Sequence, residues 1–268
     1  MMTDTRGMVI ARGRTAEVLA WQDQQVFKLF YNWVSAESIE RESRAARLVS
    51  ATNLPTPKLL GELTLDGRRG LIYARVAGKS LLTLLGTRPW LCIRYARQFA
   101  ELQAAIHLHS GTGLPALKAG LENTIRGTEG LPAGLLAAAL DRLACLPDGE
   151  TLCHFDFHPD QVMVTATGLV VLDWMTAYVG QPAADVARTT VLIRFGPVLD
   201  ASWLMQQLVN LLRGIFFRTY LHRYIELNPA VTSAAIDAWL PLVALARLAE
   251  EIPGEKGKLE AFLELAFP

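Results

Sequence analysis

Two short stretches of the chain, "HFDFHPDQVM" (154–163) and "VVLDW" (170–174), contain acidic and amide side chains suited to phosphate chemistry. Asp156 and Gln161 lie in the first stretch, and Asp173 ends the apolar run of the second. A loop after one short strand can present Asp156 and Gln161, while a second strand brings Asp173 back beside them. We therefore expect three oxygen-bearing side chains to converge.

Carboxylate and carboxamide oxygens suit Mg²⁺ better than a soft metal. Mg²⁺ prefers such hard ligands in a near-octahedral shell and keeps several of its waters. With the metal held by part of this group, one carboxylate stays free to orient a hydroxyl group. The pattern therefore indicates chemistry on a phosphate in the presence of magnesium.

The N-terminal region offers residues that suit a bound phosphate. Gly13 lets the backbone turn closely over phosphates, and Lys28, in "VFKLF", can place a positive charge against them. Glu42, in the helix expected next, is predicted to hold Lys28 in position. Glu37 and Glu40 compete with it, because the register of a helix is uncertain from one sequence.

The elements that must position these residues begin with a small α+β region. Short β-type runs at 7–12, 16–21 and 25–30 predict adjacent antiparallel strands. A charged helical pattern follows over 35–51, and its first residue, a serine, is expected to be the N-cap. Two more strands are expected within 58–78, around an Asp-Gly turn.

The chain from Leu81 onward is mainly helical in pattern. The exception is an apolar, β-rich segment at 152–173, which is expected to form a short hairpin holding the opening motif. We predict an α+β fold with an N-terminal lobe at 1–76 and a larger helical lobe at 77–268. The helical patterns cover 90–109, 131–146, 184–195 and most of 201–268.

Composition narrows the class of protein. The 268 residues are 51% hydrophobic, enough for one large domain or two lobes. Lys plus Arg (26) balance Asp plus Glu (26), so neither a nucleic acid nor an anionic membrane is an expected partner. The dispersed cysteines and the absence of a signal-peptide pattern predict a cytoplasmic protein. The oligomeric state stays open.

In these motifs the chain resembles the aminoglycoside phosphotransferase family of small-molecule kinases, which share the protein-kinase-like fold. In that family a His-x-Asp-x-His-Pro-x-Asn loop carries the catalytic Asp and a metal-binding Asn, and a later Asp binds the second metal. Here "HFDFHPDQ" and "LDW" occupy those places, and "GQPAADVART" is similar to the segment that follows. The resemblance covers nearly the whole chain.

The resemblance implies a two-lobed α+β kinase that uses ATP or GTP with Mg²⁺ to phosphorylate a hydroxyl group of a small molecule. Asp156 would be the catalytic base, and Gln161 and Asp173 would bind metal. Lys28 would contact phosphate, with Glu42 as its partner. The remaining implied site residues are Gly13, Ala74 and Val76 for the nucleotide, and Asp185 and His154 as structural supports of the catalytic loop.

The chain departs from the family pattern at two places. Phe155 replaces the usual small residue between His and Asp, and Gln161 replaces Asn. Direct ligation by Gln161 is expected, with the neighbouring Asp160 as the alternative. The departures keep open a second interpretation: a nucleotide-binding pseudokinase with a regulatory role.

The acceptor is the least defined part of the prediction. An aminoglycoside, another sugar and an amino alcohol are all compatible with the pattern. Several ammonium groups would require carboxylates, and the C-terminal region contains acidic residues. Trp239, Glu250 and Glu251 are the residues expected to line the acceptor pocket.

Overall fold

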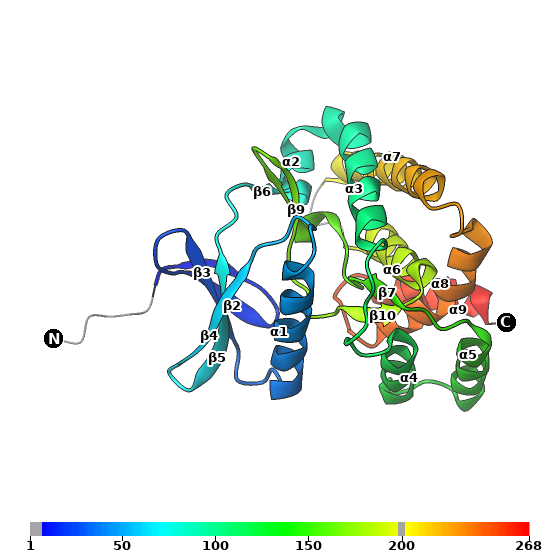
Figure 1. Cartoon of the computed structure of the whole chain (residues 1–268). Coiled ribbons are helices and arrows are strands. Elements are labelled where there is room, and N and C mark those ends of the chain that lie inside the picture. The colour runs from blue at the N-terminus through cyan, green and yellow to red at the C-terminus, as the bar shows by residue number, and fades with distance from the viewer. Residues whose placement is uncertain (1–6, 198–201, 268) are drawn as a thin grey trace. The chain divides into compact units, whose positions relative to one another are not determined.

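The computed structural model describes residues 7–197 and 202–267 (Figure 1). The chain divides into two compact units, one of Met1–Ser80 with Gln161–Ala177, and one of Leu81–Asp160 with Tyr178–Pro268. The first unit extends past residue 76 because β6 (Lys79–Ser80) pairs with the later strand β8 (Val162–Thr165). A domain boundary at 76/77 stays a prediction.

The first unit contains a five-stranded antiparallel sheet with the order β1-β2-β3-β5-β4. Its first three strands follow one another in the sheet, as the sequence predicts. The turn between β4 and β5 uses Asp66 and Gly67, both at positive φ (52° and 75°), which is typical of a tight hairpin. The strands are β1 (Val9–Arg12), β2 (Ala16–Ala20), β3 (Gln25–Phe30), β4 (Leu59–Leu65) and β5 (Arg68–Ala74).

Helix α1 (Ala36–Ser50) packs against β4 and β5. Ser35 is its N-cap, and the Ser35 side chain accepts a hydrogen bond from the Ser38 amide, which satisfies one of the free amides of the first turn. Ile39 of the helix joins Phe30 and Leu71 of the sheet in a buried apolar cluster. This packing fixes the register of α1 over the sheet.

The segment around the catalytic motif differs from the single hairpin that the sequence predicts. The hairpin is formed by β8 and β9 (Gly168–Val171), after the motif. The strand before the motif, β7 (Thr151–Cys153), pairs instead with β10 (Tyr178–Gly180) in the second unit. The loop 154–161 therefore connects β7, which pairs with β10, to β8, which pairs with β9.

The second unit is mainly helical, with α3 packed on α7, and α6 on α8. The helices predicted from the sequence are present, while residues 201 and 268 lie outside the described part of the chain. None of the described helices is long and apolar enough to cross a membrane. The helices are α2 (Leu81–Thr87), α3 (Cys92–Ile106), α4 (Leu117–Gly127), α5 (Ala133–Cys145), α6 (Pro182–Phe195), α7 (Trp203–Leu227), α8 (Ser233–Leu248) and α9 (Lys256–Ala266), with short 3-10 turns at Pro89–Leu91 and Pro159–Gln161.

Candidate active site

Lys28 lies at the centre of the polar cluster in the first unit. It projects from β3, and its Nζ donates to both carboxylate oxygens of Glu42 at 2.9 and 2.8 Å. The same Nζ donates to Oδ1 of Asp173 at 2.9 Å. Residues from a strand, a helix and the segment after β9 thus meet at one ammonium group.

The helix register decides which glutamate meets Lys28. Glu42 is 1% exposed, whereas Glu40 makes a surface salt bridge with Arg69 at 3.6 Å. The Tyr73 hydroxyl also donates to Glu42, at 2.9 Å. Burial by itself lowers the pKa of Lys28, but the charges of Asp173 and Glu42 outweigh it and raise that pKa, so Lys28 stays protonated.

Asp173 has a φ of 58°, in the left-handed region that Asp tolerates better than most residues. The residues on either side fix this conformation. Trp174 donates its indole N–H to the Thr56 hydroxyl at 2.9 Å, and that hydroxyl donates to the carbonyl of Val171 at 3.2 Å. Met175 packs into the apolar cluster of the sheet. The "LDW" stretch is therefore anchored to the sheet that carries Lys28.

Gln161 lies at the start of the β8–β9 hairpin in the same unit. Its carbonyl accepts from the amide of Leu172 at 2.9 Å, so the backbone of Gln161 is paired with the residue directly before Asp173. The candidate ligands Gln161 and Asp173 thus flank one hydrogen-bonded end of the hairpin. The expected convergence of the side chains of Asp156, Gln161 and Asp173 stays a prediction.

The donor set of this unit fits Mg²⁺. Asp173 and Gln161 offer hard oxygen atoms, and the single ammonium group of Lys28 is shared between the carboxyl groups of Glu42 and Asp173, so a triphosphate needs accompanying positive charge. The described residues contain no group of three or more His, Cys, Asp or Glu side chains able to hold a metal. The other ligands of an ion would therefore be waters and phosphate oxygens.

The remaining nucleotide candidates lie at the ends of strands in the same sheet. Gly13 lies between β1 and β2, and a Cβ added there would meet only the carbonyl oxygen of Ala16 at 3.7 Å, an ordinary contact. Among the described residues, no protein atom therefore requires glycine at this position. Ala74 ends β5, and Val76 follows it two residues later, partly buried.

The second unit contains the loop with Asp156. The carboxylate of Asp156 lies 3.6 Å from Nε2 of His158 and 3.9 Å from the guanidinium of Arg188. Burial by itself raises the pKa of Asp156, but His158, Arg188 and His154 favour the carboxylate more strongly and lower the pKa to about 2. Asp156 is therefore ionised at neutral pH.

Asp185 of α6 holds the backbone of this loop. It is completely buried, and its carboxylate accepts from the amide of Phe155 at 2.6 Å and from that of His154 at 3.4 Å. Gln103 donates to it at 3.0 Å, and His107 lies at 2.9 Å. Burial raises the pKa of Asp185, but the hydrogen bond and charge of His107 lead the interactions that lower it overall.

Phe155, the unusual residue of the motif, has a φ of 62°. Positive φ is rare for a bulky side chain and explains why a small residue is usual there. The Phe155 ring contacts Tyr178 edge to face at 5.5 Å, and Arg188 lies over the ring at 5.6 Å while donating to the Phe155 carbonyl at 3.2 Å. Contacts to the ring and to both backbone polar groups thus offset the strain.

His154 is completely buried, and its Nδ1 accepts from the amide of Asp156 at 3.2 Å. This bond links the first His of the motif to the residue proposed for catalysis. His158 makes a similar bond, accepting from the amide of Asp160 at 3.3 Å. Both histidines therefore shape the loop.

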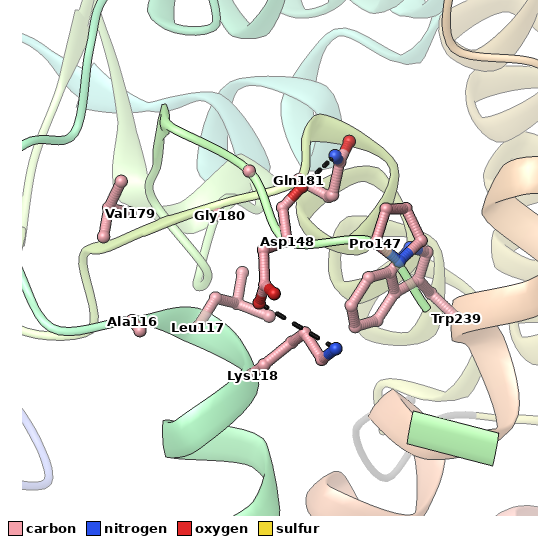
Figure 2. A pocket seen from close by; sticks show the side chains of 10 residues that line it. Ala116, Leu117, Lys118, Pro147, Asp148, Val179, Gly180, Gln181 and Trp239 are labelled. Carbon is pink, nitrogen blue, oxygen red and sulfur yellow. Dashed lines mark hydrogen bonds and ion pairs between the residues drawn. The ribbon is translucent and has the colours of Figure 1, made fainter. Parts of the chain in front are cut away.

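Trp239 lies in a different part of the second unit from Asp156. It is 2% exposed and lines a pocket of about 180 Å³ together with Lys118 and Asp148, which form an ion pair at 3.9 Å (Figure 2). This volume is below the roughly 300–1,000 Å³ of most small-molecule sites. A role of Trp239 in acceptor binding stays a prediction.

Glu250 and Glu251, the other residues expected at the acceptor pocket, follow α8. Glu250 accepts hydrogen bonds from Arg188 and from Arg247, the latter at 2.6 Å, so arginines already balance its charge. Glu251 is exposed, with a φ of 51°. Glu250 thus contacts Arg188, the arginine near Asp156, whereas Trp239 lines the small pocket with Lys118.

Sequence reasoning missed Arg188 and the buried polar groups around Asp185. Arg188 follows Asp185 by three residues in "GQPAADVART", so helical spacing could have placed both on one face. Gln103, His107 and Tyr220 come from distant helices, and no local pattern signals them.

A model of the phosphotransferase enzyme family matches residues 10–227. The chain belongs to this family. No curated protein matches the chain.

Solved structures with the same fold are distant in sequence. Amicoumacin kinase hAmiN, in complex with AMP-PNP, Ca²⁺ and Ami, has a TM-score of 0.65 at 13% identity, covering 96% of this chain and 85% of that one. The streptomycin–ATP complex of APH(2")-IIa has a TM-score of 0.58 at 15% identity, with coverages of 96% and 90%. Choline kinase from Cryptosporidium parvum Iowa II has a TM-score of 0.56 at 10% identity, with coverages of 97% and 87%.

Proposed function

We propose that the chain transfers the γ-phosphoryl group of ATP or GTP to a hydroxyl group of a small molecule, with Mg²⁺ as the metal. The observation that carries the proposal is the contact of one partly buried lysine, Lys28, with both Glu42 and Asp173. Removing charged groups from water costs free energy. A lysine that is already held in position beside a candidate metal ligand suits a bound triphosphate.

The first unit binds the nucleotide in this account. Lys28 contacts phosphate oxygens while Glu42 and Tyr73 hold its side chain in place. Asp173 and Gln161 would hold a magnesium ion, which would supply positive charge to offset that of the phosphates. Gly13, Ala74 and Val76 contact the nucleotide from the ends of their strands.

Asp156 orients the acceptor hydroxyl and accepts its proton. With a pKa near 2, the carboxylate is a weak base but a permanent hydrogen-bond acceptor. Phosphoryl transfer has a loose transition state in most analyses, so positioning matters more than basicity. The acceptor oxygen forms a bond to the γ-phosphorus as the bond to the leaving nucleoside diphosphate breaks.

A pseudokinase remains the alternative because of Gln161. Its carboxamide is one methylene farther from the backbone than that of Asn, and Mg²⁺ accepts ligands only near ~2.0–2.1 Å. The other departure, Phe155, weighs less, because its backbone is held by Asp185 and Arg188. The proposal accordingly assigns activity to a loop shaped around Gln161.

The partners and location follow from the same account. ATP and AMP-PNP occur in the names of the similar structures, which favours a nucleotide substrate here. The balanced charge of the chain supports neither a nucleic acid nor a membrane surface as partner, and a cytoplasmic enzyme acting on a small molecule is the proposal that fits.

The test combines turnover with binding. The purified chain is incubated with γ-labelled ATP or GTP, Mg²⁺ and a panel of hydroxyl compounds, and labelled product is counted beside nucleotide affinity with and without Mg²⁺. The proposal predicts Mg²⁺-dependent transfer that Lys28→Met abolishes and the exposed control Lys58→Met retains. Tight nucleotide binding without transfer to any compound would favour the pseudokinase instead.

A further inference from the structure

The second unit contains a cavity to which the proposed function assigns no ligand. Its volume is about 460 Å³, within the roughly 300–1,000 Å³ range of sites that bind small molecules. Residues of α2, α6 and α7 form half of its described lining. The cavity is thus large enough for part of an acceptor.

Part of this wall is the loop that carries Asp156. His158, Pro159 and Asp160 line the cavity, and Nε2 of His158 lies 3.6 Å from the Asp156 carboxylate. A molecule in the cavity therefore contacts the same loop as the carboxylate proposed to orient its hydroxyl. The small pocket beside Trp239 lacks this link, because its described lining residues do not include the loop.

The cavity is mainly apolar. Cys92 and Phe216 add to an apolar surface in which aliphatic side chains and prolines make up half of the described lining, among them Leu85, Pro89, Leu192, Ile193, Val209 and Leu212. Burying an apolar group against such a surface contributes ~0.8 kcal/mol per methylene. The wall therefore favours an acceptor with an apolar body.

The charges of the wall argue against an acceptor with several ammonium groups. Among the described lining residues the acidic ones, Asp160 and Glu255, are balanced by Arg213 and Arg247. Arg247 donates to both oxygens of Glu255, at 2.6 and 2.8 Å. A polycation placed here would meet arginines and lose its water without gaining a surplus of carboxylates.

Two acidic residues of the C-terminal region form ion pairs with neighbouring basic side chains. Glu250 accepts from Arg188 and Arg247, and Glu226 forms salt bridges with Arg223 and His222. The acidic character of the C-terminal sequence therefore does not create an acidic pocket at these positions.

We infer that this cavity binds the apolar body of an acceptor that is a hydroxyl compound without multiple positive charges. The inference rests on the proposed phosphotransferase function and names its substrate class. It separates this chain from phosphotransferases whose acceptors are polyamines such as gentamicin.

A series of n-alkyl glucosides tests the inference, because the hydroxyl groups stay constant while the apolar part grows. Affinities of methyl, hexyl and octyl glucoside are measured by calorimetry without nucleotide, beside gentamicin. Full burial strengthens binding by about fourfold per methylene. Hexyl glucoside should therefore bind at least ~10-fold more tightly than methyl glucoside, even with incomplete burial.

Glycine offers matched variants that fill the cavity or leave it unchanged. Gly86 of α2 lines the cavity, and a Cβ there meets no atom within 4 Å, as is also true of Gly134 on α5, which does not line it. Gly86→Phe should reduce octyl glucoside binding at least ~10-fold, whereas Gly134→Phe should not. Val209→Phe on α7 is a second filling variant, and a circular dichroism spectrum and thermal unfolding midpoint like those of the wild type show that each variant is folded.

Affinity that does not rise with alkyl length, tighter binding of gentamicin, or equal effects of Gly86→Phe and Gly134→Phe would each overturn the inference. Phosphoryl-transfer assays on the same compounds distinguish an error in the inferred acceptor site from an error in the proposed phosphotransferase function. Length-dependent binding without any phosphoryl transfer would contradict the function and support the apolar site. Transfer to gentamicin that Gly86→Phe leaves unchanged would support the function and refute the site.

Discussion

The main-chain amide of Phe155 donates to the buried carboxylate of Asp185 over 2.6 Å, although Phe155 has a φ of 62°. This bond joins the residue before Asp156 to helix α6. Arg188, one turn further along α6, holds the carbonyl and the ring of the same phenylalanine. The loop geometry thus depends on α6 more than on the local sequence.

The positive φ of Phe155 predicts an unusual order of stability. Phe155→Ala and Phe155→Gly both remove the ring, but glycine adopts this conformation without the cost of order 1 kcal/mol that alanine incurs. Phe155→Gly should therefore be the more stable of the two, by about 1 kcal/mol, the reverse of the usual order. Denaturant unfolding of both variants measures this, and a less stable glycine variant would contradict the backbone conformation.

The pairing of Lys28 with Glu42 predicts that substituting Glu42 reduces activity more than substituting Glu40. Glu42→Gln loosens Lys28 and leaves a buried ammonium with less compensation, so transfer and nucleotide affinity should both fall. Glu40→Gln is the matched control, since Glu40 bonds only weakly at the surface with Arg69. Steady-state kinetics and nucleotide titrations compare the two, and a larger effect of Glu40→Gln would contradict the assigned role of Glu42.

These contacts also show what the sequence can predict. Alternation along β3 and the helical pattern after it were enough to identify the strand and the helix, but they left Glu37, Glu40 and Glu42 as candidate partners of Lys28. The choice of Glu42 came from the resemblance to a family. The contact between Lys28 and Asp173 spans 145 positions in the chain, and only the resemblance to a family suggested that both belong to one site. Nothing local indicated that Glu250 bonds with arginines, because acidic residues on helices usually face solvent.

The length of Gln161 leads to a prediction about magnesium. If the loop is shaped around Gln, shortening the side chain misplaces the ligand by on the order of 1 Å, which can cost ~10²-fold in rate. Gln161→Asn should therefore lower turnover, and Gln161→Ala should raise the Mg²⁺ concentration needed for half-maximal rate. Gln22→Asn, in an exposed loop of the same unit, is the control. A Gln161→Asn variant faster than the wild type would support the pseudokinase interpretation.

The lowered pKa of Asp156 predicts how its contribution to stability changes with pH. The folded-state pKa is about 2, below the ordinary value of 3.8, so the contribution is fully present above the ordinary value and is lost as pH falls toward the folded value. The wild type should therefore lose stability relative to Asp156→Asn between about pH 5 and about pH 2. Denaturant unfolding across this range measures the difference, and a wild type that gained relative stability would contradict the assignment.

The most direct test of the account measures phosphoryl transfer by Asp156→Asn. Labelled γ-phosphate from ATP is followed onto the best acceptor in wild type, in Asp156→Asn and in the control Asp141→Asn on the exposed face of α5. Loss of a positioned proton acceptor should lower the rate by at least ~10²-fold in Asp156→Asn, with nucleotide affinity unchanged and the control fully active. Transfer by Asp156→Asn at the wild-type rate would contradict the central claim that Asp156 orients the acceptor hydroxyl.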